Sequence, residues 1–305
     1  MKCSVKWIKF IHLILTARTP TRERERESKT HAIVINDVGG GDFSALMVNG
    51  LIDLHLFAQS LMFPLHYYTQ TPKDKNALFN SSDYEQHDGI TNYALNEFQT
   101  IYKDKSITKE DIFYYIYALL HNETYKKKFK NNLSKELPRI PFMLDFKHFV
   151  KVGRELGHLH VNYETLEPSK KVDIEIKGQM GGLFNANALK EIEPTKLIVK
   201  QMQFKKGKLR TYDKSIIHYN DFITLTNIPL KAYRYIVNGK SAIEWIMERY
   251  SIKIDKDSNI ENNANLYSQN PYYILNLLLS VIEVSVRSVD LIESLEYKEL
   301  NPSLF

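Results

Sequence analysis

Val172-Asp173-Ile174-Glu175-Ile176 alternates apolar and charged residues, and this stretch decides the fold class. A period of two is typical of a β-strand with one buried and one solvated face. Two further segments, 197–204 and 216–224, have similar spacing and are separated by turns rich in Gly and Asn. The sequence therefore predicts a central, mainly antiparallel sheet.

Segments with helical periodicity precede and follow the predicted strands in the sequence. Before the strands, apolar residues recur at helical spacing after position 108, after position 122 and over 146–157. After the strands, the same spacing returns. Residues that can begin a helix precede four of these segments: Thr108, Asn122, Ser241 and Asn270. Grouped helices and grouped strands predict an α+β fold with helical segments flanking the sheet.

The N-terminal third has a different pattern. Ala32-Ile33-Val34-Ile35 predicts a short buried strand, and Gly39-Gly40-Gly41 predicts a loop. The polar stretch 69–88 is typical of an exposed linker. We expect residues 1–31, which include alternating Arg and Glu, to form a disordered or non-native leader without a role in the fold.

Composition excludes several protein classes. The chain has 305 residues, 43% of them hydrophobic, a net charge of +5 and one cysteine, Cys3. These values exclude collagen-like, wholly disordered and disulfide-scaffold chains. One cysteine permits neither an intramolecular disulfide nor a thiolate zinc cage, which indicates a cytoplasmic protein. The apolar run from Trp7 to Ala17 is shorter than the ~20 residues that span a bilayer, so we expect no membrane association.

Motifs for catalysis are scarce. Gly39-Gly40-Gly41 lacks the Lys-Ser/Thr of a phosphate-binding loop, and the chain has no Gly-x-Ser-x-Gly nucleophile elbow. His158 and His160 point to different sides of a predicted helix, so structural roles are expected and no metal site is predicted. One alternative is a magnesium-dependent nuclease using Glu175 and Lys177, which would need a further Asp from a neighbouring strand.

Local charge gives a stronger indication. Between positions 196 and 214 the chain has seven Lys or Arg residues and one acidic residue, Asp213, whereas the tail from Ser251 onward has four basic and eight acidic residues. Lysine and arginine attract phosphates, and glutamine can form paired hydrogen bonds with adenine. The sequence predicts double-stranded DNA as partner, with contacts from Lys200, Gln201, Gln203, Lys205, Lys206, Lys208 and Arg210, and outlying contacts from Arg139 and Lys147. A second basic region lies over 126–139, and its cluster Lys126–Lys130 more often reflects a solvated helix surface.

Several phrases together resemble Type ISP restriction-modification enzymes, which combine nuclease, helicase-like translocase, adenine methyltransferase and target recognition. Those similar to the end of the methyltransferase region are Phe43-Ser44-Ala45-Leu46-Met47, Asp53-Leu54-His55-Leu56 and Phe63-Pro64-Leu65. Those similar to the C-terminal specificity domain begin with Ile107-Thr108-Lys109-Glu110-Asp111 and continue through Leu137-Pro138-Arg139-Ile140-Pro141-Phe142, Leu159-His160-Val161-Asn162-Tyr163-Glu164 and Val237-Asn238-Gly239-Lys240-Ser241.

The resemblance implies sequence-specific DNA recognition. It implies a methyltransferase stub over 32–70 and a specificity domain over 71–305. The chain lacks the Asn/Asp-Pro-Pro-Tyr/Phe element of adenine methylation and the motor motifs of a helicase, so we expect no catalysis by this chain alone. S-adenosylmethionine, ATP and magnesium are implied only for the full-length family. The partners that the resemblance implies are double-stranded DNA and a separately encoded methyltransferase/helicase portion of the enzyme. The other alternative is an interaction remnant that docks on those portions without binding DNA.

Overall fold

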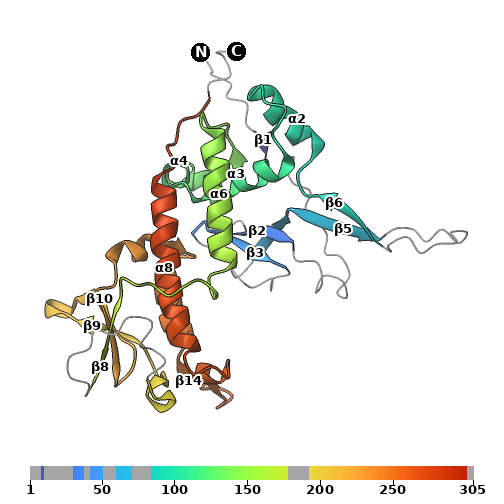
Figure 1. Ribbon diagram of the computed structural model, residues 1–305. Coiled ribbons are helices and arrows are strands. Elements are labelled where there is room, and N and C mark those ends of the chain that lie inside the picture. The colour runs from blue at the N-terminus through green and yellow to red at the C-terminus, as the bar shows by residue number, and fades with distance from the viewer. Residues whose placement is uncertain are drawn as a thin grey trace, which may run out of the picture. The chain divides into compact units, whose positions relative to one another are not determined.

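The computed structural model describes residues 8–9, 30–37, 42–50, 60–70, 84–177 and 192–300. The chain divides into two compact units: a first unit, Met1–Val161 with Leu291–Phe305, and a second unit, Asn162–Asp290. Helices and antiparallel strands occur in both, so the predicted α+β class is confirmed (Figure 1). The strands form several antiparallel sheets, the largest with four strands. None of the helices in the described ranges is long and apolar enough to cross a membrane.

The first unit contains a three-stranded antiparallel sheet in the order β3-β2-β4. Its strands are β2 (His31–Asn36), β3 (Ala45–Asn49) and β4 (Ser60–Pro64). Residues 32–36 of β2 are buried, which confirms the strand predicted at 32–35. The tripeptide Gly39-Gly40-Gly41 lies outside the described residues.

A two-stranded antiparallel ladder follows, formed by β5 (His66–Gln70) and β6 (Tyr84–Asp88). The linker predicted over 69–88 is therefore wrong at both ends. Thr69 is paired with Glu85, and the ring of Tyr67 stacks on that of His87 at 5.3 Å between centroids. Cross-strand aromatic and polar pairs stabilise these segments as strands despite their polar composition.

The helices of the first unit are α2 (Asn92–Ile101), α3 (Lys109–His121), α4 (Glu123–Lys128), α5 (Lys130–Leu133) and α6 (Phe146–Val161). The short strands β1 (Ile8–Lys9) and β7 (Arg139–Ile140) pair with each other. Thr108 and Asp111 form a capping box at α3, and Asn122 caps α4, as predicted. Residues 112–121 of α3 are all buried, so this helix lies inside the unit rather than on its surface.

Helix α6 packs against α3 (Figure 1). The prediction that α6 ends near Gly157 is wrong, because the helix continues to Val161. A Cβ atom at Gly153 would lie 1.9 Å from the backbone oxygen of Tyr114, and one at Gly157 would lie 3.2 Å from the side chains of Met47 and Tyr114. Both glycines therefore serve close helix packing.

The second unit is built on a four-stranded antiparallel sheet in the order β8-β11-β10-β9. The strands are β8 (Asp173–Ile176), β9 (Gln203–Lys206), β10 (Tyr212–His218) and β11 (Ile223–Thr226). Two α-helices follow in this part of the chain, α7 (Ala242–Arg249) and α8 (Tyr273–Glu293), and the last residues of α8 belong to the first unit. The short 3-10 helices are η2 (Pro194–Leu197), η3 (Lys208–Arg210), η4 (Leu230–Arg234) and η5 (Ala264–Leu266). Two short antiparallel pairs complete the unit: β12 (Ile236–Val237) with β13 (Lys240–Ser241), and β14 (Ile252–Ile254) with β15 (Glu261–Asn263).

The strand predicted at 172–176 is confirmed as β8, and the other two predicted strands need correction. Residues 216–224 are interrupted by a turn, because the side chain of Asn220 accepts hydrogen bonds from the amides of Phe222 and Ile223 at 2.9 and 2.8 Å. Residues 197–204 contain the end of η2 and only the start of β9. Here the amide of Val199 donates to the side chain of Asn265 instead of to a neighbouring strand.

One hydrophobic core joins the buried face of this sheet to α8. Ile174, Ile217 and Leu225 from the sheet are at most 1% exposed, as are Leu275 and Leu278 from α8. Burying such side chains stabilises the fold by about 1.5–3 kcal/mol each. The core fixes one face of the four-stranded sheet. The opposite face of the sheet and the β9–β10 hairpin are thus positioned by this core.

Candidate nucleic-acid interface

The predicted basic hairpin exists as β9, a turn and β10. Lys206 pairs with Tyr212 at the last position of the ladder. The turn is closed by the amide of Gly207, which donates to the carbonyl oxygen of Thr211 at 2.9 Å, and by the Thr211 hydroxyl, which donates to the carbonyl oxygen of Lys208 at 2.6 Å. These bonds hold Lys205, Lys206 and Lys208 within one short turn of backbone.

The exposed face of the sheet carries a row of polar side chains across all four strands. Gln203 on β9 pairs with His218 on β10, His218 with Thr224 on β11, and Thr224 with Glu175 on β8. The Nδ1 atom of His218 lies 3.2 Å from the hydroxyl of Thr224. Paired residues share a face of an antiparallel sheet, so these four groups form one polar line.

Lys200 and Gln201 lie outside this sheet. Both side chains are exposed, as predicted for DNA contacts. However, β9 begins at Gln203, and the carbonyl oxygen of Lys200 accepts a hydrogen bond from the amide of Ile252 at 2.9 Å. The prediction that Gln201 and Gln203 belong to one strand is therefore wrong, because the segment before β9 is bonded to the start of β14.

The hairpin and the segment before it carry four exposed lysines that form no ion pair with any described residue. In the described parts of the chain no carboxylate forms an ion pair with Lys200, Lys205, Lys206 or Lys208, and all four side chains are exposed. The acidic residue of the hairpin, Asp213, stands opposite Lys205. Hydrogen bonds from the side chain and amide of Ser215, with the nearby charge of Lys205, lower the pKa of Asp213.

Other basic residues of the same region are held by the fold. The ammonium of Lys214 lies 2.9 Å from Oε1 of Glu244 and over the rings of Phe204 and Tyr233, at 5.6 and 5.3 Å from their centroids. Lys196 pairs with Glu193 at 3.4 Å. The side chain of Arg210 lies outside the described part. Among the described basic side chains of 196–214, those without an ion pair therefore lie at 200–208. Exposed lysines without an ion pair also occur elsewhere in the described residues, for example Lys130, Lys135 and Lys177.

The two outlying residues lie in the first unit and both have partners. The guanidinium of Arg139 lies 2.8 Å from Glu136, and the ammonium of Lys147 lies 3.2 Å from Asp104. Both side chains are nevertheless exposed, so a contact with DNA stays a prediction for them.

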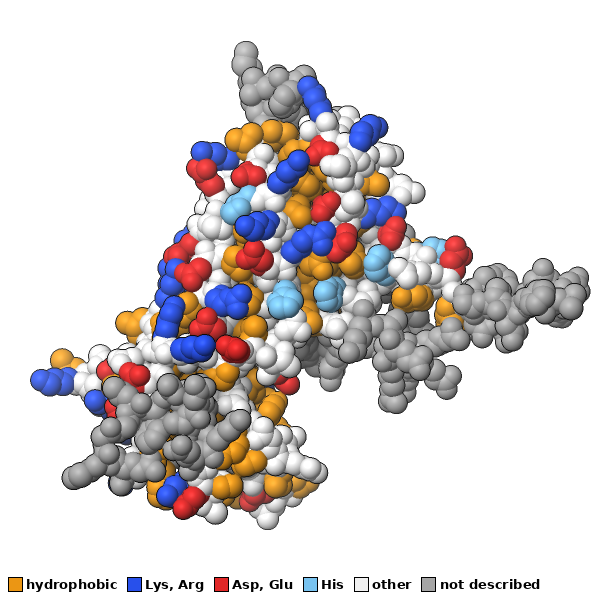
Figure 2. Space-filling view, in the orientation of Figure 1, with side chains coloured by type: hydrophobic (Ala, Val, Ile, Leu, Met, Phe, Trp, Pro, Cys, Tyr) orange, Lys and Arg blue, Asp and Glu red, His pale blue; other side chains and the backbone are white. Residues whose placement is uncertain are grey.

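The basic region 126–139 is partly ion-paired within its own unit, whereas Lys130 and Lys135 are exposed. Lys127 pairs with Glu123 at 3.3 Å, and Lys128 pairs with Glu299 at 2.6 Å. Burial lowers the pKa of Lys126. Over the helices of this unit, Figure 2 shows basic and acidic side chains interspersed on the visible face. This pattern is typical of a solvated helical surface.

The residues of the nuclease alternative lie at the edge strand β8. Glu175 and Lys177 are exposed, and the neighbouring strand β11 reads Ile223-Thr224-Leu225-Thr226, without a carboxylate. Among the described residues no three His, Cys, Asp or Glu side chains are grouped so that they could hold a metal ion. His160 is buried, with its Nδ1 2.5 Å from the hydroxyl of Tyr117, which is a structural role.

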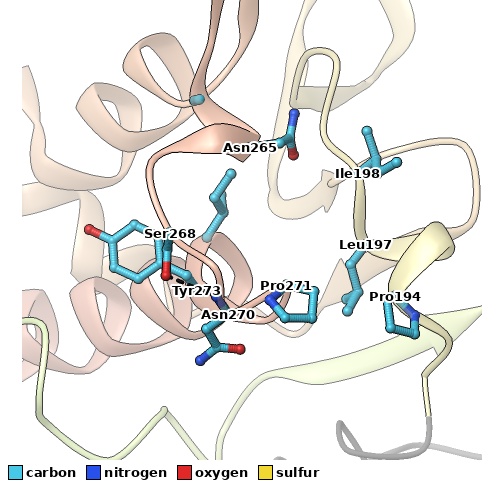
Figure 3. A pocket seen from close by; sticks show the side chains of 10 residues that line it. Pro194, Leu197, Ile198, Asn265, Ser268, Asn270, Pro271 and Tyr273 are labelled. Carbon is cyan, nitrogen blue, oxygen red and sulfur yellow. Dashed lines mark hydrogen bonds between the residues drawn. The ribbon is translucent and has the colours of Figure 1, made fainter.

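The second unit also has a small pocket of about 90 Å³ (Figure 3). Its polar side chains are engaged with the backbone around it. Asn265 accepts from the amide of Val199 and donates to its carbonyl oxygen, both at 2.9 Å, and Asn270 accepts from the amide of Tyr272 at 3.0 Å. These bonds hold the loop between η5 and α8, so the pocket is best explained as a structural feature.

Comparison with known proteins identifies the domain. The model of the Type ISP C-terminal specificity domain matches residues 5–277. The chain belongs to this family. The predicted resemblance is thereby confirmed. The match spans the positions at which domain boundaries are expected, 31 and 70, and both boundaries stay predictions. No curated protein matches the chain.

Three solved structures are similar to this specificity domain. They are the ATP-dependent Type ISP restriction-modification enzyme LlaBIII bound to DNA (TM-score 0.72, 35% identity, 90% of this chain and 16% of that one), a nuclease-deletion mutant of the Type ISP enzyme LlaGI in complex with a DNA substrate mimic (0.67, 34%, 90% and 22%), and a DrdV–DNA complex (0.72, 28%, 89% and 25%). The chain therefore spans a quarter or less of the length of each of these proteins.

Three exposed residues of the specificity domain's hairpin were not predicted from sequence. Leu209 at the turn is 97% exposed, Tyr212 on β10 is 61% exposed, and His218 is exposed beside Gln203. A correct start for β10 would have placed Tyr212 and His218 on the hairpin. No sequence signal marks Leu209, because apolar residues are usually read as core.

Proposed function

We propose that this chain recognises double-stranded DNA sequence-specifically, as the target-recognition part of a Type ISP restriction-modification system. The observation that carries the proposal is the β9–β10 hairpin, where exposed lysines without ion-pair partners stand beside exposed polar side chains. Its membership of the specificity-domain family supports the proposal, and the three similar structures are DNA complexes.

In the hairpin, different side chains would bind phosphates and read bases. A two-stranded ribbon fits the major groove of B-DNA. The ammonium groups of Lys205, Lys206 and Lys208 would hold phosphates, which fixes the register without reading sequence. Gln203 would read a base edge, with His218 beside it, because an amide can donate to and accept from adenine at once.

Chemistry after recognition would be carried by methyltransferase and helicase portions, whose motifs this sequence lacks. Binding by this chain would present the target adenine, which the methyltransferase flips out of the duplex. S-adenosylmethionine, ATP and magnesium belong to those portions in this proposal. We place the protein in the cytoplasm, where the DNA substrate is.

An interaction role is the second candidate, supported by exposed apolar side chains on the second unit. Ile254, Ile260, Leu266 and Tyr267 are 59%, 66%, 80% and 57% exposed. Grouped apolar exposure can mark a surface that binds another protein portion. Docking on a separately encoded enzyme portion would then accompany DNA binding or replace it.

One titration separates these functions. The purified full chain is mixed with labelled random duplex DNA at a series of salt concentrations, with magnesium present. Salt-dependent binding without cleavage is the expected result. Absence of binding at low salt would contradict the proposal and favour the interaction role. Cleavage that Glu175→Ala abolishes would favour the nuclease alternative.

A further inference from the structure

Leu209 occupies an unusual position at the end of the β9–β10 hairpin. Its side chain is 97% exposed and its φ is +56°, in the left-handed region. Among the described residues, the other non-glycine residues with positive φ are polar: Lys103, Asn227, Asn238 and Asn259. Asn tolerates this conformation better than leucine does.

Folding does not explain a leucine here. A leucine stabilises a fold by removing apolar surface from water, and Leu209 removes almost none. Its backbone conformation is also unfavourable for a residue with a bulky side chain. A residue that is costly in the isolated domain and gains nothing from burial indicates a contact outside the domain.

The surroundings indicate what that contact is. Lys205, Lys206 and Lys208 lie within four residues of Leu209 and are exposed, and Tyr212 is 61% exposed where the second strand begins. Figure 2 shows apolar and basic side chains together at the projecting end of this hairpin. An exposed apolar side chain next to exposed lysines in the same turn matches a polyanion with an apolar interior, which is a stacked DNA duplex.

We propose that Leu209 inserts between two adjacent base pairs of duplex DNA, while the flanking lysines hold the phosphates of the same step. This inference rests on the proposed function and adds a mode of recognition to it. In proteins that bind the minor groove, leucine and similar side chains act as wedges that partly unstack a base step and kink the duplex, and we assign the same action to Leu209 at the tip of the hairpin. Pyrimidine–purine steps unstack most easily, so insertion adds specificity for deformable sequences.

The consequence can be measured without knowing the target sequence. A duplex with a single abasic site has already lost stacking at one step, so a wedge enters it more easily. Binding of the full chain to a matched duplex and to the same duplex with one abasic site is compared by fluorescence anisotropy across a salt series. The wild type is expected to bind the interrupted duplex about tenfold more tightly.

Three variants complete the experiment. Leu209→Asn suits the left-handed turn and removes the wedge, so it should fold normally, bind both duplexes equally and keep the wild-type salt dependence. Leu209→Met should retain the preference, because methionine also serves as a wedge. Leu230→Ala is the matched control, since Leu230 is 63% exposed in η4, outside the hairpin.

Each outcome is decisive. A preference that Leu209→Asn retains, or a wild type that binds both duplexes equally, would overturn the insertion while leaving DNA binding intact. A wild type that binds neither duplex would overturn the proposed function as well as the insertion.

Discussion

The ammonium of Lys214 lies 2.9 Å from Oε1 of Glu244, the residue that completes the capping box of α7. Partial burial would raise the pKa of Glu244, but hydrogen bonds from Lys214 and Ser241 lower it. Lys214 therefore belongs to the fold, whereas Lys206 on the same hairpin is exposed.

Replacing Lys214 should reduce stability rather than DNA binding. Lys214→Ala removes a partly exposed ion pair and the contacts with two aromatic rings, so we expect a loss of about 1 kcal/mol in the free energy of unfolding. Urea denaturation measures this loss. The salt dependence of DNA binding should stay at the wild-type value, and a lower slope would show that Lys214 contacts phosphate.

Replacing Lys206 should have the opposite effect. Lys206→Ala is expected to weaken binding to all sequences equally and to reduce the slope of log K against log salt by about 1. The control is Lys170→Ala, because Lys170 is an exposed lysine of the same unit that pairs with Glu167 at 3.6 Å. Equal slopes for the two variants would remove Lys206 from the interface.

Gln203 should affect specificity more than affinity. Gln203→Ala is expected to lower binding to a preferred sequence, selected from a randomised duplex pool, by about 1–3 kcal/mol. Binding to random DNA should change little, since the amide carries no charge. Competition between selected and random duplexes measures the ratio of the two affinities. If this ratio is the same for Gln203→Ala and the wild type, a base contact by Gln203 is excluded.

The first unit should lose stability in mild acid. Burial lowers the pKa of His121 to about 4 and that of His160 well below its ordinary value, and their rings lie 5.4 Å apart. Both histidines bind protons more readily when unfolded, where the pKa is 6.5. Stability is therefore full above pH 6.5 and falls as the pH decreases toward 4, by on the order of 3 kcal/mol for His121 alone. Urea denaturation between about pH 7.5 and 4.5 measures the free energy of unfolding, which should decrease as the pH falls. An equal free energy of unfolding at both ends of this range would contradict the burial argument.

The two glycines of α6 should respond differently to alanine. Gly153→Ala places a Cβ 1.9 Å from the backbone oxygen of Tyr114, so the helices must separate, and we expect a destabilisation of about 2 kcal/mol or more. Gly157→Ala meets only side-chain atoms, the flexible end of Met47 and the ring of Tyr114, both at 3.2 Å, and the helix propensity of alanine partly offsets these contacts. Thermal unfolding of both variants measures the difference, and similar melting temperatures would refute the close-packing role of Gly153.

Local chemistry made much of the fold predictable from sequence. Thr108, Asn122 and Ser241 begin helices because their side chains accept hydrogen bonds from the amides three residues later, and such signals need no tertiary information. The strand expected at 197–204 failed for the opposite reason. There the amide of Val199 bonds to Asn265, 66 residues away in sequence, and no local pattern announces that partner.

The candidate site was predictable in charge but not in geometry. The density of basic residues located the hairpin that carries Lys205 and Lys208. The pairing of Lys147 with Asp104 depends on two segments meeting in the folded chain, and so could not be read in advance. The left-handed conformation of Leu209 could not be predicted either, because the residue at this position is neither Gly nor Asn, the types that usually adopt it.

The central claim is that the basic β9–β10 hairpin holds DNA. The most direct test is the salt dependence of duplex binding by the full chain and by the variant in which Lys205, Lys206 and Lys208 are all alanine. We expect salt-dependent binding by the wild type and a slope lower by about 3 in the variant, with unchanged thermal stability. Wild-type affinity and slope in a folded triple variant would contradict the assignment of this hairpin as the DNA-binding element.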